Sequence, residues 1–214
     1  MILSITKPIL YTLFSNILEK PQLSSQLDSI IQSLNRNVET SQIMLLLAGG
    51  RTRTVQTYDE VVRDLIMSEK TYLKDLHMIT KVFREQIQRL ELTSTTELDS
   101  IFSNINDITE LTITLIGSLE DTLEMSEDGQ VTAIGSCFEE LAEAEEFEVY
   151  EKYARDVLDA ESRVRIDSLM AQPEVGDKLQ TSGQGFREAV KFYLPKLLLG
   201  PVHHCFHYFK YIGE

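Results

Sequence analysis

Residues 61–76 read VVRDLIMSEKTYLKDL, and the pattern of this stretch decides the fold class of the chain. Its apolar side chains recur at steps of three and four, which places them on one face of an α-helix. The same spacing continues in both directions, from Tyr58 to Leu90, and predicts a helix of about nine turns. The apolar positions of this run are Tyr58, Val62, Leu65, Tyr72, Leu76, Ile79, Phe83, Ile87 and Leu90. A helix of this length is unusual in a globular domain and indicates an elongated bundle.

The rest of the sequence also predicts helices. Two capping-box patterns, Thr57-x-x-Glu60 and Ser94-x-x-Glu97, mark helix starts. The second opens an apolar run to Leu119, and a polar turn follows at Glu127–Val131. Further helical stretches cover residues 134–147, 150–158, 164–170 and 186–211, with breaks or kinks at Pro195 and Pro201. No stretch alternates with the period of a strand, so we predict an all-α fold, an elongated helical bundle.

Composition excludes several classes of function. The chain has 34 acidic and 20 basic residues, a formal net charge of −14, which repels nucleic-acid phosphates and anionic lipid. No apolar run is long enough to cross a membrane, so we expect no direct membrane insertion. The two cysteines, Cys137 and Cys205, are far apart in the sequence and are interpreted as reduced thiols of a cytoplasmic protein.

Glu69 is the most informative residue of the first helix. It lies at the centre of the apolar stripe, seven residues from both Val62 and Leu76. A carboxylate there must be paired, protonated or turned towards something outside the bundle. Two interpretations stay open: a buried pair with an Arg or His of a neighbouring helix, or a helix face offered to a partner. We expect the second, with Glu69 at least partly exposed beside His203 and His207.

His203 and His207 are four residues apart and share one helical face in the segment PVHHCFHY, residues 201–208. Such a pair could hold zinc. However, no Glu lies between the two histidines as in zinc proteases, and no further ligand cluster is evident. We therefore favour a polar stripe available to a partner, with no metal.

The known motifs of covalent chemistry are missing from the sequence. Gly183-Gln184-Gly185 is too short for a phosphate-binding loop, and there is no nucleophile elbow. We expect no cofactor and a protein that acts by binding. Residues 1–54 carry no motif and are interpreted as a helical appendage and linker, separate from a domain at residues 55–214.

Three ordered blocks of the chain resemble the Dbl-homology (RhoGEF) family. The first is residues 61–76, in which Glu69 stands three residues before Tyr72. The second comprises residues 101–120 with the region 134–153, and the third is LLGPV at residues 198–202 followed by His207-Tyr208. The resemblance implies an all-helical nucleotide-exchange domain, with a further helix beyond Glu214 and regulatory domains outside this chain.

The resemblance also implies a function and a site. Family members release nucleotide from Rho-family small GTPases, so we expect a Rac-like partner and, for the complete protein, recruitment to the plasma membrane. The family's glutamate in the first helix engages switch 1, and Glu69 matches it. Positions 203 and 207 correspond to a Gln and a basic residue that reach towards switch 2. Because histidines stand there, we expect a weaker contact. The alternative is a catalytically silent helical module for docking or autoinhibition.

Overall fold

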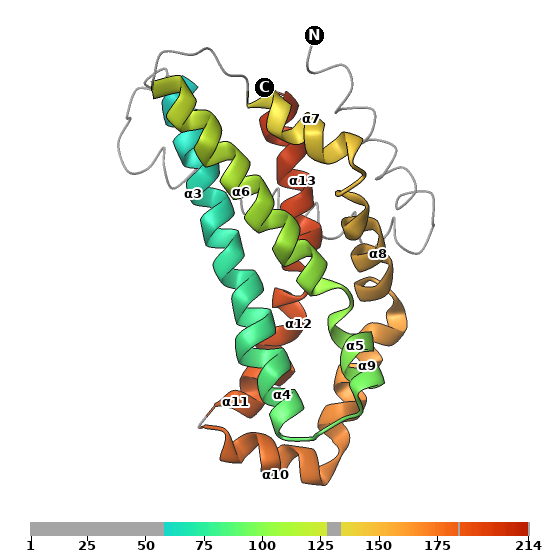
Figure 1. The fold of residues 1–214 in the computed structure, drawn as a ribbon. Helices are drawn as coiled ribbons and strands as arrows, with labels where there is room; N and C mark the ends of the chain where they lie inside the picture. Colours follow the sequence, from blue (N-terminus) through green and yellow to red (C-terminus); the bar gives the residue numbers. More distant parts are fainter. Residues whose placement is uncertain (1–57, 128–133, 184, 214) are drawn as a thin grey trace, which may run out of the picture.

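The computed structural model describes residues 58–127, 134–183 and 185–213, and these form an elongated bundle of helices (Figure 1). No β-strand occurs within these ranges, which confirms the all-α prediction. In chain order the elements are α3 (Tyr58–His77), η1 (Met78–Arg84), α4 (Glu85–Arg89), α5 (Thr95–Phe102), α6 (Ile105–Glu127), α7 (Gly135–Glu143), α8 (Glu148–Val157), α9 (Ala160–Ala171), α10 (Pro173–Thr181), α11 (Phe186–Glu188), η2 (Ala189–Tyr193), α12 (Leu194–Leu197) and α13 (Gly200–Gly213).

The first long helix runs continuously from α3 through η1 to α4, as the sequence predicts. It lies alongside α6 over much of the bundle, and α10 crosses the end opposite to α13 (Figure 1). The apolar positions of its stripe are buried almost throughout, and Tyr58, at the first described position, is the exposed exception. The proposed capping residue Thr57 lies outside the described residues. The hydrophobic core therefore extends along the whole length of this helix.

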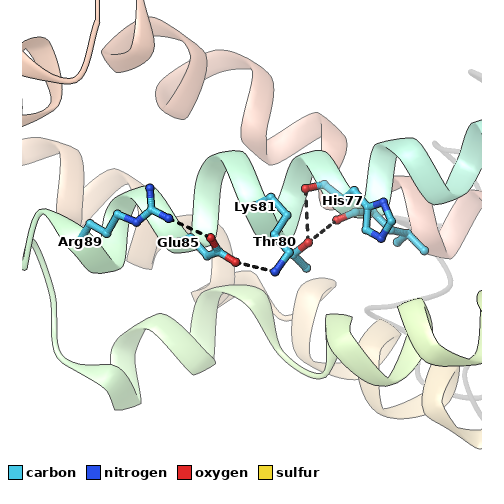
Figure 2. Close-up of polar contacts among 6 residues, drawn as sticks. His77, Thr80, Lys81, Glu85 and Arg89 are labelled. Atoms are coloured by element: carbon cyan, nitrogen blue, oxygen red, sulfur yellow. Dashed lines mark hydrogen bonds and ion pairs between the residues drawn. The ribbon is translucent and has the colours of Figure 1, made fainter.

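The middle of the long helix, η1, is a π-helix, which the apolar spacing did not predict. The Glu85 N–H donates to the carbonyl of Thr80, five residues back. The Thr80 hydroxyl lies 3.1 Å from the Leu76 carbonyl and 3.3 Å from that of His77, where it satisfies backbone acceptors beside the widened turn (Figure 2). On the exposed side, Glu85 pairs with Lys81 and Arg89 (Figure 2).

The predicted helix from Ser94 to Leu119 is two helices. Its start is confirmed, because the Ser94 hydroxyl accepts from the Glu97 N–H while the Glu97 side chain accepts from the Ser94 N–H. The break falls at Ser103, whose φ of 47° ends α5. The Ser103 hydroxyl bonds Asp156, and the Asn104 amide donates to the Val149 carbonyl of α8. Tertiary hydrogen bonds thus stabilise a turn inside an unbroken apolar pattern.

The C-terminal segment is irregular near both prolines, where the sequence predicts breaks or kinks: it becomes π-helical before Pro195 and is interrupted before Pro201. The π-helix η2 precedes Pro195 and gives way to α12, and α13 begins at Gly200 with Pro201 in its first turn. The two π-helical segments meet in space, since the Phe83 ring lies 6.3 Å from that of Tyr193 and 5.8 Å from Phe186. Helix α10 was not predicted, and the proposed turn at Glu127–Val131 lies mostly outside the described residues. None of the helices within the described ranges is both long and apolar enough to span a bilayer.

Candidate functional site

A groove of about 590 Å³ lies between α3 and the start of α13 and is lined by residues of both helices. Gly200 and Pro201, in the first turn of α13, both line the groove. Its other lining residues are Asp64, Met67, Ser68, Thr71, Tyr72, Asp75, Leu76, Ile79, Leu197, His203, His204 and His207. Met67 is a large apolar side chain of this lining and is 64% exposed, so it offers apolar surface within the groove.

Both histidines of the predicted polar stripe line this groove, which confirms that His203 and His207 share one face of α13. His207 is exposed and His203 is half-buried. The Nε2 atom of His203 is buried and has no hydrogen-bond partner within the described part of the chain. Burial, and then the nearby His207, lower the pKa of His203, so its imidazole is neutral at neutral pH.

Glu69 does not lie on this surface, and the expectation that it is partly exposed is wrong. Its exposed fraction is 1%, and its carboxylate points into the interface between α3 and α13. Oε1 lies 2.8 Å from Nε2 of His204, and Oε2 accepts a hydrogen bond of 3.0 Å from the Tyr208 hydroxyl. The other interpretation, a buried pair with a histidine of a neighbouring helix, is the one observed. The apolar stripe that contains Glu69 turns it inwards together with Val62 and Leu76.

We call Glu69, His204 and Tyr208 the Glu69 clasp. The Tyr208 O–H donates to Oε2, and His204 donates to Oε1 in the tautomer that carries its proton on Nε2. His204 and Tyr208 are one turn apart on α13, and one side chain of α3 therefore holds two successive turns of α13. Each carboxylate oxygen has one partner, as a buried charged group requires.

A layer of aromatic rings surrounds the clasp. The Tyr72 ring stacks on the His204 ring with 3.6 Å between centroids, and the Tyr72 hydroxyl lies 3.3 Å from that of Tyr150. Tyr208 packs edge-on against Phe138, Phe147 and Tyr150. Burial, followed by the neighbouring Tyr150 and Glu69, holds the pKa of Tyr208 well above its usual value, so its hydroxyl stays protonated and able to donate.

The groove is lined by side chains that can bind a partner. No group of three or more potential metal ligands occurs among the residues that the structure describes. Cys205 is buried beside the clasp, and burial and the charge of Glu69 raise the pKa of its thiol well above the usual value, which disfavours the nucleophilic thiolate. The sequence interpretation missed His204 and Tyr208. These two residues form a second pair at spacing four, in the same segment as His203 and His207. A buried glutamate on another helix needs hydrogen-bond donors, and this requirement was the signal that could have identified them.

Comparison with known proteins identifies the class to which this fold and site belong. Residues 61–212 match the RhoGEF domain family. Since this match covers more than half of the chain, the chain belongs to the RhoGEF, or Dbl-homology, family. A RhoGEF domain is a nucleotide-exchange module and not a covalent catalyst.

Among individual proteins, the chain is 54% identical to the Drosophila melanogaster protein son of sevenless over 185 residues, which are 86% of this chain and 12% of that protein. It is 29% identical to the Son of sevenless homolog of Caenorhabditis elegans over 73% of this chain and 12% of that protein. Human Rho guanine nucleotide exchange factor 37 is 33% identical over 60% of this chain and 18% of that protein. The chain thus spans about an eighth of the length of its Son of sevenless relatives. Residues 55–214 make up about three quarters of the chain, whereas the Drosophila match covers 86% of it. The match therefore includes part of residues 1–54.

Proposed function

We propose that this chain is a guanine-nucleotide exchange module for a Rho-family, Rac-like small GTPase, and that it binds the GTPase switch regions along the groove between α3 and α13. The single observation that carries the proposal is the groove itself, within a chain of the RhoGEF family. It brings the first long helix and the C-terminal helix to one open face. That face combines an exposed apolar side chain, Met67, with the imidazoles of His203 and His207.

The proposed mechanism is differential binding. A protein that binds the nucleotide-free GTPase more tightly than the loaded GTPase must weaken nucleotide binding by the same factor, because the two equilibria are linked. This mechanism needs a complementary surface and no acid, base or metal. The groove supplies apolar contact through Met67 and hydrogen-bonding groups through Ser68, Thr71 and the two histidines. We place this activity in the cytoplasm, with recruitment to the plasma membrane in the complete protein.

A second candidate function, a catalytically silent docking or autoinhibitory module, is favoured by the state of Glu69. Both of its carboxylate oxygens are engaged within the chain, so it offers no free carboxylate to a switch region. In this alternative the groove still binds a partner, but binding does not distinguish the nucleotide-free from the loaded GTPase. The two functions therefore predict different outcomes for one measurement.

The test is the release of fluorescent GDP from Rac-, Rho- and Ras-type GTPases in the presence of the chain. We expect the chain to accelerate release from the Rac-type GTPase most. Binding without acceleration would support the silent module, and neither binding nor acceleration would contradict both functions.

Two matched pairs of variants connect the activity to the groove. Met67→Ala lies in the groove, whereas Met125→Ala changes a similarly exposed methionine of α6 that does not line it. His207→Ala and His77→Ala form the same comparison for exposed histidines. We expect the groove variant of each pair to slow GDP release and its control to leave the rate unchanged. Equal rates within both pairs would place the GTPase on another surface.

A further inference from the structure

The arrangement of α13 gives Glu69 an indirect role in the proposed function. Successive residues of an α-helix are separated by about 100° around its axis. His204 and Tyr208 face inwards to Glu69, and the residues immediately before them, His203 and His207, therefore face the groove. A rotation of α13 that turned His204 and Tyr208 away from Glu69 would also carry His203 and His207 away from their present positions.

We infer that Glu69 is a positioning residue, which fixes the rotation of α13 and thereby presents His203 and His207 to the partner. This inference rests on the proposed function of the groove. It differs from the role implied by the resemblance, in which the carboxylate itself contacts switch 1. Its basis is the 1% exposure of Glu69 and the use of each of its oxygens by a separate turn of α13.

Apolar packing alone would not specify this rotation so strictly. The Tyr208 ring contacts Phe138, Phe147 and Tyr150, and the burial of apolar surface is not directional. Hydrogen bonds impose distance and angle, and a buried donor left without its acceptor is costly. The stack of Tyr72 on His204 adds a second constraint from the next turn of α3. The clasp thus contributes orientation where the surrounding aromatic residues contribute burial.

The experiment compares three variants of the full chain by two readouts. Glu69→Gln keeps an oxygen for the Tyr208 hydroxyl and an amide that can bond His204. Glu69→Leu removes both bonds, and Tyr208→Phe removes one bond but keeps the ring. The first readout is the rate at which diethyl pyrocarbonate modifies each histidine, followed by peptide mass spectrometry. The second is the rate of GDP release from the Rac-type GTPase.

In the unaltered chain we expect fast modification of exposed His207, slower modification of His203 and protection of buried His204. Glu69→Gln should keep this order and most of the exchange rate. Glu69→Leu should remove the protection of His204 and slow exchange at least about tenfold, the effect of one decade in affinity. Tyr208→Phe should also expose His204 to modification and slow exchange. If circular dichroism shows that Glu69→Leu does not fold, the result for Tyr208→Phe tests the inference in its place.

Three outcomes would overturn the inference. Loss of exchange in Glu69→Gln with His204 still protected would make the carboxylate a direct contact. Faster exchange in Glu69→Leu or Tyr208→Phe would make the clasp an inhibitory lock. Unchanged histidine modification in both would show that Glu69 does not orient α13. If the unaltered chain releases no GDP, the proposed function fails, while the modification pattern still reports whether Glu69 orients α13.

Discussion

Two glutamates in different regions of the bundle accept hydrogen bonds in contrasting settings. Glu69 lies between α3 and α13, is buried and accepts from His204 and Tyr208, which are 135 and 139 residues away in sequence. Glu97, in the first turn of α5, is exposed and accepts from Thr93 and Ser94, which are four and three residues away. Both carboxylates are satisfied, but only Glu69 connects distant parts of the chain.

The comparison shows how burial changes the importance of a hydrogen bond. Water can replace a lost partner at Glu97, so the net contribution of each bond there is small. Glu69 is only 1% exposed, so bulk water cannot replace a lost partner, and removal of one partner leaves the others unsatisfied in a medium of low dielectric constant. We therefore expect the Glu69 region to dominate stability and the geometry of the groove, and the Glu97 region to affect only the start of one helix.

The largest expected effect is that of Glu69→Ala. This change removes a buried acceptor from two donors and should lower the free energy of unfolding by about 3–5 kcal/mol. Urea denaturation at neutral pH measures the loss, and Glu97→Ala is the control, for which we expect a far smaller change. Similar losses for both variants would contradict the difference that burial is expected to make.

Tyr208→Phe should have the next largest effect. It removes one hydroxyl from the clasp and preserves the aromatic packing, so we expect a loss of about 1.5–3 kcal/mol, the range for a hydrogen bond to a charged acceptor. The matched control is Tyr153→Phe, since the Tyr153 hydroxyl is equally buried but donates to a neutral carbonyl, that of Leu198, at 2.8 Å. The control should lose about 0.5–1.5 kcal/mol. If it loses as much as Tyr208→Phe, the carboxylate acceptor contributes nothing extra.

The same contrast explains how much of the structure could be predicted from the sequence. The capping box at Ser94 is a local pattern, and it was found with its partners. The apolar stripe placed Glu69 facing inwards, but its donors on α13 depend on how two distant segments pack, so the exposed interpretation was chosen wrongly. The turn at Ser103 was missed because the apolar spacing continues through it and its hydrogen bonds to α8 are tertiary. The π-helical segments were not predicted because they change the apolar spacing too little to be recognised in the sequence.

Ser94→Ala should have a smaller effect than either change in the clasp. The Ser94 hydroxyl accepts from the Glu97 N–H at 3.2 Å and donates to the Glu97 carboxylate at 2.9 Å. Loss of a serine N-cap costs about 0.5–2 kcal/mol, typically near 1. Thermal unfolding followed by circular dichroism measures this change. Thr96→Ala, two residues further along at an exposed position, is the control and should be neutral. A neutral Ser94→Ala would show that the N-terminus of α5 frays without affecting the rest of the bundle.

The smallest expected effect is the pH dependence contributed by Glu97. The hydrogen bond from the Thr93 hydroxyl, followed by those from the Ser94 N–H and hydroxyl, lowers the pKa of Glu97 below its ordinary value of 4.5. Because the folded-state pKa is the lower one, this carboxylate stabilises the fold fully above pH 4.5, and the contribution is lost as the pH falls through the folded-state pKa. The difference in unfolding free energy between the unaltered chain and Glu97→Gln should therefore shrink as the pH falls below 4.5.

Glu85 provides the comparison that identifies the cause of this pH dependence. Its pKa is also lowered, chiefly by a hydrogen bond from Lys81 and then by the charges of Lys81 and Arg89. Glu85→Gln should show a pH dependence of the same sign. Added salt should weaken the Glu85 contribution, because exposed charge pairs are screened, and should leave that of Glu97 nearly unchanged, because its donors are uncharged. Urea denaturation at neutral and acidic pH, each at low and high salt, measures both. Equal salt sensitivity for the two variants would mean that Glu97 is stabilised by the general field of the protein and not by its capping box.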